Sequence, residues 1–339
     1  MRVLRSLLLT AVVGTTAGLM FAGDAAAQSP VRIRTSWVVP VSNWSSILGQ
    51  KADLMKHNGK SYVLEDIRFQ GTPPMIAALA TGEIEIANLA YSSLALAVEN
   101  AHMDDLRVIA DEFQDGVAGY HTNEFFVAKD SPIKTVEDLK GKVLATNAVG
   151  SAVDIAMRAM LRKHKLEDKR DLTIVEAAFP NMRSMLLDKK IDLFPGVLPF
   201  SQDPAIREVV RPLFTQKDAV GPTQMIVWSA RAGFIQKNRA AMVDFMEDTL
   251  RVQRWFADPA NHKEVVDIAV KLSKQPADKF DSWLFTKKDY YRDPNGKPDL
   301  AALQANVDLQ KELGFLKAGF DVKKYADLSL VEEAAKRLK

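Results

Sequence analysis

The chain of 339 residues carries 45 lysines and arginines against 43 acidic residues, for a formal net charge of +2, and it contains no cysteine. The near balance of charge gives no support for nucleic-acid binding. The lack of cysteine excludes disulfides, thiolate metal sites, a cysteine nucleophile and a lipid attached to cysteine. The length exceeds what one hydrophobic core usually serves, which predicts two domains.

The first 27 residues have the pattern of a secretory signal peptide. Arg2 and Arg5 supply the positive start, residues 7–21 an apolar stretch, and residues 25–27 the three alanines typical of a cleavage site. Glycines and threonines interrupt the apolar stretch, which falls short of the roughly 20 residues of a membrane span. We therefore predict that the mature chain begins at Gln28 and is exported.

Short β-rich runs alternate with helical stretches from Val31 to about Ser229, which indicates an α/β fold with largely parallel sheets. Cap residues, Pro-rich starts and Gly stops set the expected boundaries of the first unit. Its predicted elements are a strand at 31–35, a helix at 43–56 capped by Ser42 or Asn43, a strand at 62–69, a helix at 75–80 with Thr72 as cap, a strand at 84–87, a helix from Tyr91 to Val98 and a strand at 106–110.

A polar passage at 111–123 is predicted to cross into a second unit. The expected elements there are strands at 124–128, 142–145, 172–176 and 191–194, a short helix at the capping box 135–138, and helices at 152–164, capped by Ser151, and 182–188. Residues 211–222 are predicted to cross back, so that a strand at 223–229 rejoins the first sheet. The remainder is predicted to be helical, with apolar periodicity at 242–256, 261–272 and 300–313.

These elements predict two lobes joined by a hinge of two segments, an arrangement suited to closing over a ligand. Lobe I is expected to hold residues 28–117 and 218–339, and lobe II residues 118–217.

The candidate ligand residues follow from the position of the loops. In open α/β sheets, ligands lie beyond the carboxyl ends of the strands. Several of these loops end in a Ser, Thr or Asn followed by a helix, whose free N–H groups can hold an anion without a dedicated arginine. The alternative is that each is an ordinary helix cap. The predicted polar ligand residues are Asn43, Gly71, Thr72, Ser92, Asn147, Gly150 and Ser151.

The same loops carry aromatic side chains, which predicts a ligand with a substantial organic part. The alternative for each ring is packing in the core or between lobes. The rings considered are Trp37, Trp44, Tyr91, Phe179 and Phe200. His121 is expected at the hinge, where it either bonds the ligand or has a structural role.

Motifs for catalysis and metal binding are missing from the sequence. No two histidines have the spacing of a zinc helix motif, and there is no Gly-x-Ser-x-Gly elbow, Gly-x-Gly-x-x-Gly fingerprint or P-loop. We therefore predict a protein that is not an enzyme, with no cofactor and no metal.

Two passages carry a resemblance to a known family. Residues 69–87 have a strand, a Gly-containing turn, a helix and an Ala-Leu-x-x-Gly-x-Ile run, with Glu85 where the family usually has Asp. Residues 128–142 resemble the opening of the family's second domain, and Gly150-Ser151 follow at the expected distance. The chain thus resembles the sulfonate, nitrate and taurine branch of periplasmic binding proteins, which are grouped with the thiamine-pyrimidine synthase-like proteins.

The resemblance implies a Venus-flytrap fold, a periplasmic location, and the membrane permease and ATPase of an ABC importer as partners. It also implies an anion between the lobes, at loops around Trp37, Gly71-Thr72, Tyr91-Ser92, Gly150-Ser151 and Phe179-Pro180. Together with the helix starts and aromatic rings of these loops, this predicts a sulfonate or a carboxylate, aromatic carboxylates included. The basic residues that some relatives aim at an acid group are not evident in these loops.

Two other functions remain open on this fold. A periplasmic enzyme would need an acid, base or nucleophile in the cleft, for which His121, Glu112 and Ser151 are the candidates. A ligand-sensing subunit of a signalling system would need only closure, as transport does. In each case we expect a monomer.

Overall fold

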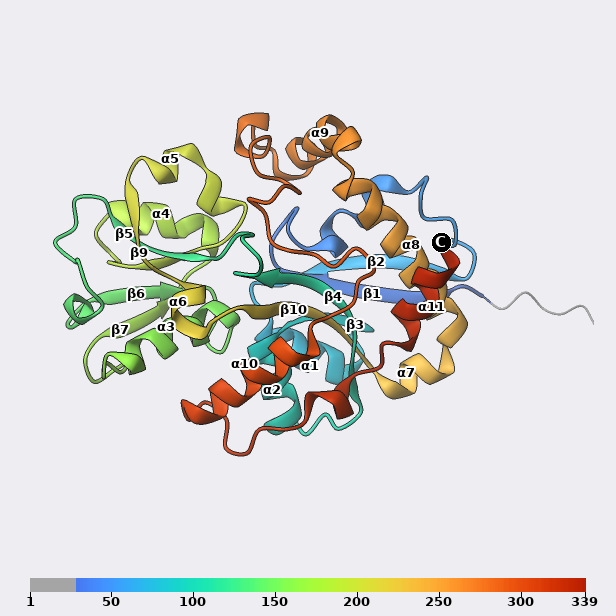
Figure 1. Ribbon diagram of the computed structural model, residues 1–339, viewed down its shortest axis with the longest axis horizontal. Coiled ribbons are helices and arrows are strands. Elements are labelled where there is room, and N and C mark those ends of the chain that lie inside the picture. The colour runs from blue at the N-terminus through green and yellow to red at the C-terminus, as the bar shows by residue number, and fades with distance from the viewer. Residues whose placement is uncertain (1–28) are drawn as a thin grey trace, which may run out of the picture.

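The computed structural model describes residues 29–339, and the predicted signal peptide lies outside the described residues. Figure 1 shows two lobes side by side, with strands β4 and β10 leading from one toward the other. The α/β fold and the two-lobed arrangement are those predicted. The proposed boundaries at 117/118 and 217/218 lie between β4 and β5 and within the short helix α6, and they stay a prediction.

Lobe I is built on a five-stranded sheet in the order β2-β1-β3-β10-β4. Strand β1 runs parallel to β2 and β3, whereas β10 is antiparallel to both of its neighbours. The prediction that residues 223–229 return to the first sheet is therefore confirmed. The strands of this sheet are β1 (Val31–Trp37), β2 (Tyr62–Arg68), β3 (Ile86–Ala90), β4 (Leu106–Asp115) and β10 (Thr223–Arg231).

Helices cover both faces of this sheet, with α1, α2 and α10 on one side and α8 and α11 on the other, and α9 packs on α8 farther from the sheet (Figure 1). Helix α1 ends at Gly82, whose φ of 73° is the left-handed conformation typical of a glycine helix stop. The helices of this lobe are α1 (Pro73–Thr81), α2 (Tyr91–Glu99), α7 (Ala232–Lys237), α8 (Arg239–Ala257), α9 (His262–Ser273), α10 (Leu300–Glu312) and α11 (Ser329–Arg337).

Lobe II has two small sheets. Strand β5 pairs antiparallel with β8 and β9, and β6 pairs parallel with β7. The prediction of largely parallel sheets is therefore wrong, because both crossing segments bring strands back antiparallel and the sheets of the two lobes are mixed. The strands are β5 (Glu124–Ala128), β6 (Val143–Thr146), β7 (Thr173–Glu176), β8 (Phe194–Gly196) and β9 (Val210–Thr215). The helices are α3 (Ala152–Lys163), α4 (Phe179–Leu187), α5 (Pro204–Arg207) and α6 (Gln216–Val220).

The helix predicted at 43–56 is wrong. Only two short 3-10 helices, Trp44–Ser46 and Leu48–Lys51, form there. The side-chain oxygen of Asn43 accepts hydrogen bonds from the N–H groups of Val38 and Val39, which precede it. Because the amide serves the preceding loop, it does not cap a following helix.

The segment after β10 is also less helical than predicted. Residues 280–299 form a strap that lies along β4, where Gln114 and Tyr291 exchange backbone hydrogen bonds and the N–H of Asp111 bonds to the carbonyl of Gly296. Strand β4 continues to Asp115, five residues further than predicted, because backbone and side-chain donors satisfy its buried carboxylates. A polar stretch that looked like a linker is therefore the end of the edge strand β4, which leads from lobe I toward lobe II.

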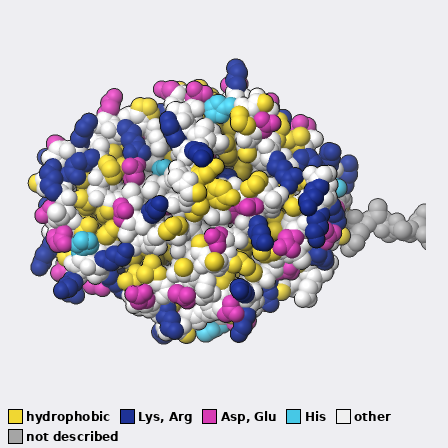
Figure 2. All heavy atoms as spheres, viewed as in Figure 1, with side chains coloured by type: hydrophobic (Ala, Val, Ile, Leu, Met, Phe, Trp, Pro, Cys, Tyr) yellow, Lys and Arg dark blue, Asp and Glu magenta, His cyan; other side chains and the backbone are white. Residues whose placement is uncertain are grey.

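Basic and acidic side chains are interspersed over the face of the molecule seen in Figure 2, as the balanced composition predicts. The longest helix within residues 29–339 is α8, and none of the helices there combines the length and apolar character of a membrane span.

Candidate ligand site between the lobes

A cavity of about 60 Å³ lies between the lobes, and we call it the inner chamber. At roughly 10–15 Å³ for each water-sized group, it has room for about four to six non-hydrogen atoms. Its walls come from the loop after β1, strands β3, β4 and β10 and the strap in lobe I, and from the starts of α3 and α4 and the loop after β8 in lobe II. The lining residues are Val38, Val39, Ser42, Asn43, Thr72, Ala90, Phe113, Asn147, Ser151, Ala152, Val153, Phe179, Val197, Leu198, Met225, Ile226 and Tyr290.

A second hollow of about 230 Å³ lies at the mouth of the cleft, and we call it the outer chamber. It shares Val38 and Phe179 with the inner chamber, so the two chambers lie next to each other. The rings of Phe179 and Phe200 stack on one side with their centroids 6.1 Å apart. The lining residues are Val38, Arg68, Phe69, Gln70, Ala178, Phe179, Pro180 and Phe200.

The start of α3 supplies hydrogen-bond donors to the inner chamber. Ser151 caps the helix as predicted, since its hydroxyl accepts from the N–H of Asp154. Within residues 29–339, the N–H groups of Ala152 and Val153 have no acceptor. Free N–H groups and the helix dipole both favour an anion at this point.

The start of α1 differs although it carries the same sequence signal. Thr72 is the residue before the helix, but its hydroxyl bonds to that of Ser93, 2.7 Å away, and does not cap. Pro73 and Pro74 fill the first two helical positions and have no N–H groups. The start of α1 therefore contacts the chamber but offers it few hydrogen-bond donors.

The polar side chains that line the inner chamber are already bonded to other parts of the protein. Two of these bonds, from the Ser42 hydroxyl to the carbonyl of Leu198 (3.1 Å) and from the Asn147 amide to the carbonyl of Gln70 (3.1 Å), join the lobes. The others are Ser151 to the Asn147 side-chain oxygen (2.8 Å) and Tyr290 to the Asn123 side-chain oxygen (2.6 Å). Apart from the α3 start, the chamber therefore presents mainly apolar surface.

Further bonds hold the lobes together beside the chamber. The Tyr91 hydroxyl donates to the carbonyl of Ala152 and the Ser92 hydroxyl to that of Gly150. A Cβ added at Gly71 would lie 2.7 Å from the Cβ of Ala148 across the gap. These residues make the contact that brings the lobes together.

A buried acid lies beneath the lobe I wall. Glu112 accepts hydrogen bonds from the Asn43 amide, the N–H of Trp44 and the Asn88 amide. Burial raises the pKa of Glu112 to about 8, although these donors lower it in part. Glu112 thereby fixes Asn43, which in turn holds the loop at Val38.

The structure brings together many of the residues predicted from sequence. The residues that line a chamber are Asn43, Thr72, Asn147, Ser151, Phe179, Pro180 and Phe200. Four others, Gly71, Tyr91, Ser92 and Gly150, lie at the contact between lobes. The remaining three, Trp37, Trp44 and His121, line neither chamber.

Those three side chains have other neighbours. Trp44 is buried against Phe285 of the strap, with ring centroids 5.1 Å apart, and the Arg292 guanidinium lies 5.3 Å from its ring centroid. His121 packs edge-on against Tyr290, and burial lowers its pKa to about 3, which keeps the imidazole neutral. Trp37 is held by Asp66 at the rim.

Sequence reasoning missed the apolar chamber residues Phe113, Met225 and Ile226 because they read as ordinary strand residues. It missed Tyr290 because no local pattern places the strap in the cleft. Arg68 could have been predicted as a ligand residue from the sequence, because it is a charged residue at the carboxyl end of β2 and that end faces the cleft.

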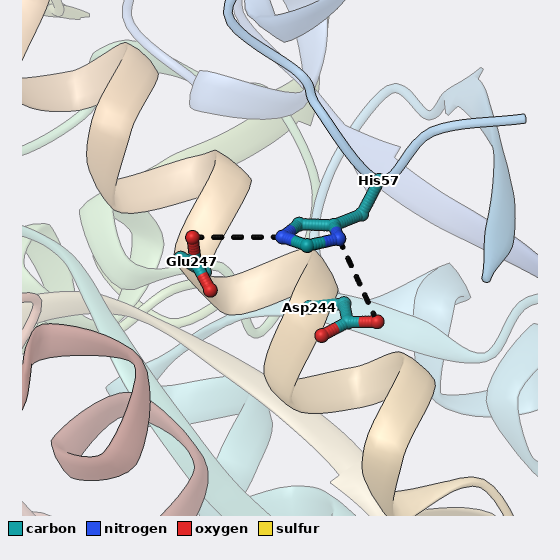
Figure 3. Close-up of side chains that lie close together, drawn as sticks. All are labelled: His57, Asp244 and Glu247. Carbon is teal, nitrogen blue, oxygen red and sulfur yellow. Dashed lines mark ion pairs between the residues drawn. The ribbon is translucent and has the colours of Figure 1, made fainter. Parts of the chain in front are cut away.

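Figure 3 shows the group of His57, Asp244 and Glu247, whose ligand atoms lie within 4.8 Å of one another. The imidazole lies 3.8 Å from Asp244 and 3.5 Å from Glu247. Arg337 pairs with Asp244 at 2.9 Å, and Arg251 pairs with Glu247. Because arginines already neutralise both carboxylates, we interpret this group as a structural cluster and not as a metal site. It joins the loop at His57 to α8 and, through Arg337, to α11.

Comparisons with known proteins agree with this architecture. Residues 26–270 match the NMT1-like family. The alkanesulfonate-binding protein SsuA from Xanthomonas axonopodis pv. citri bound to MOPS superimposes with a TM-score of 0.69 at 16% identity, over 89% of this chain and 100% of that one. The periplasmic nitrate-binding protein NrtA from Synechocystis PCC 6803 gives 0.70 at 15% identity, over 91% and 89%.

An enzyme shares the fold as well. The desulfurization enzyme DSZB superimposes with a TM-score of 0.64 at 13% identity, over 91% of this chain and 100% of that one. No curated protein sequence shows a significant match. At these identities the solved structures establish the fold alone, whereas the family match covers most of the chain. The chain belongs to the NMT1-like family and has the two-lobed fold of periplasmic solute-binding proteins.

Proposed function

We propose that this protein is the periplasmic solute-binding component of an ABC importer and that it holds a small organic anion in the inner chamber. The observation that carries the proposal is the chamber itself, enclosed by both lobes and lined on one side by the start of α3. A ligand there favours the closed arrangement, which the permease and its ATPase recognise.

The acid group of the ligand is held by the N–H groups of Ala152 and Val153. A helix start contributes up to about 2 kcal/mol in a partly buried site. A micromolar ligand needs about 8 kcal/mol in total. Apolar contact of one or two carbons with Phe113, Met225 and Ile226 adds about 1–2 kcal/mol, so most of the remainder has to come from contacts of the ligand outside the inner chamber.

The lining of the chambers favours binding over catalysis. No histidine, aspartate or glutamate among residues 29–339 lines either chamber. Of the three candidates for an enzyme, His121 and Glu112 lie outside the chambers, and the hydroxyl of Ser151 donates to the side-chain oxygen of Asn147. We therefore propose that the ligand leaves unchanged. A sensing role needs the same closure, and neighbouring permease and ATPase genes would decide for transport.

The proposal is tested by a thermal-shift screen across organic sulfonates, aromatic carboxylates, amino acids and nitrate, followed by calorimetry. An organic anion at a hundred times its dissociation constant adds about 2.7 kcal/mol of stability. Ile226→Phe fills the inner chamber and should abolish this gain, whereas the control Ile226→Val should keep it. No stabilisation by any organic anion, full binding to Ile226→Phe, or chemical conversion of the bound compound would contradict the proposal.

A further inference from the structure

The outer chamber has a different chemistry from the inner one. Its walls carry aromatic rings from both lobes, Phe69 from lobe I and the stacked pair Phe179 and Phe200 from lobe II. Arg68 is the one charged side chain among the lining residues of both chambers within residues 29–339.

Arg68 has the surroundings of a group that is available to a ligand. It is exposed at the end of β2, and its guanidinium lies 5.4 Å from the centroid of the Trp37 ring. The indole N–H of Trp37 donates to Asp66 at 2.7 Å, which fixes the ring under the guanidinium. No carboxylate within residues 29–339 forms an ion pair with Arg68. The cation is therefore oriented by stacking and left without an anionic partner.

The inner chamber limits what the ligand can place there. It has room for about four to six non-hydrogen atoms, which is an acid group with one or two carbons. Its polar side chains are committed to the protein, so the donors that remain are backbone N–H groups at helix starts, among them those of Ala152 and Val153. A longer ligand must pass Val38 and Phe179 into the outer chamber, where it meets Arg68.

We propose that the ligand carries two acid groups joined by a short apolar linker, one held at the start of α3 and the other paired with Arg68 at the mouth of the cleft. Dicarboxylates, disulfonates and sulfocarboxylates belong to this class. Phe179 and Val38, which line both chambers, contact the linker. This inference rests on the proposed function, because it assumes that the inner chamber takes an acid group.

The experiment compares matched mono- and diacids with the same carbon chain or ring by calorimetry: hexanoate against adipate, butanesulfonate against butanedisulfonate, and benzoate against terephthalate. We expect at least one diacid to bind about fivefold tighter than its monoacid, since an exposed ion pair contributes up to about 1 kcal/mol. Arg68→Ala should remove this advantage and leave monoacid affinity within about twofold, and Arg68→Lys should keep part of it. Lys60→Ala is the control, because Lys60 is exposed just before β2, at the end of the strand opposite Arg68.

The outcomes separate this inference from the proposed function. If monoacids bind as tightly as diacids and Arg68→Ala changes neither, the two-acid ligand is wrong and the solute-binding function stands. A diacid advantage that survives in Arg68→Ala, or that Lys60→Ala removes equally, also overturns the role of Arg68. Failure of all six probes to bind the wild type counts against both the inference and an organic anion in the inner chamber.

Discussion

The two walls of the inner chamber look alike in sequence and differ in chemistry. On the lobe I wall, Asn43 serves its own loop and α1 starts with two prolines, so these two positions supply few donors. On the lobe II wall, Ser151 caps α3 and leaves two N–H groups free. A cap residue after a strand thus predicts where a helix begins, and the residues that follow it decide whether that start can hold an anion.

The largest expected effect concerns the buried acid that supports the lobe I wall. Burial raises the pKa of Glu112 to about 8, above its ordinary value of 4.5. The stability contributed by the neutral carboxyl is fully present below pH 4.5 and is lost as the pH rises toward 8. In the wild type, this carboxyl should lower the free energy of unfolding by on the order of 3 kcal/mol as the pH rises from 5 to 8. Glu112→Gln, which cannot ionise, should lack this decrease.

The measurement is urea unfolding at a series of pH values. Asp111 and Asp115, whose pKa values burial raises to about 7, add a slope of the same sign. The test is therefore the difference in slope between wild type and Glu112→Gln. Exposed Glu332→Gln serves as control and should keep the wild-type slope. Equal slopes for wild type and Glu112→Gln would show that Glu112 is ionised in the folded protein.

The next effect in size concerns Gly71, where the lobe I wall meets lobe II. In Gly71→Ala the new Cβ would lie 2.7 Å from the Cβ of Ala148 and 3.1 Å from the amide nitrogen of Asn147. Overpacking of this kind costs about 2 kcal/mol, and since the clash arises only when the lobes meet, ligand affinity should fall roughly thirtyfold. Calorimetry with the ligand found by the thermal-shift screen measures the change.

Gly49→Ala is the matched control, because a Cβ there meets nothing within 4 Å. The free energy of unfolding of Gly71→Ala should stay close to that of the wild type if the clash acts through closure. A large loss of stability with unchanged affinity would place the contact within the fold of each lobe and not in the closing movement.

The contrast between the walls also explains what sequence could and could not predict. The strand and helix alternation, the return of β10 and the Ser151 cap follow from local patterns, and the structure has them. The strap is different, because Tyr290 reaches the chamber by pairing with Asn123, far away in the chain. Trp44 has the sequence context of a ligand-facing ring, but its partner Phe285 is equally remote. Lining residues such as Phe113 and Ile226 carry the same apolar signal as the core.

The smallest expected effect comes from a substitution that gives the start of α3 the same chemistry as the start of α1. Ala152→Pro places proline at the first position of α3, where the backbone tolerates it, since Ser151 before it is extended with φ −68° and ψ 163°. The substitution removes one free N–H, as Pro73 does in α1. A hydrogen bond to a charged group contributes about 1.5–3 kcal/mol, and because the N–H of Val153 remains, we expect the lower end of this range and a fall in anion affinity of about tenfold.

The bulk of the proline ring has to be separated from the loss of the donor. Ala152→Val adds similar volume and keeps the N–H, so it should retain most of the affinity that Ala152→Pro loses. Pro73→Ala restores an N–H at the start of α1. It should change affinity less than about twofold, because the hydroxyl of Thr72 bonds to Ser93 and does not cap this helix. If Ala152→Val and Ala152→Pro weaken binding equally, the loss comes from the added volume and not from the missing N–H. The two walls would then not differ in the hydrogen-bond donors that they offer the anion.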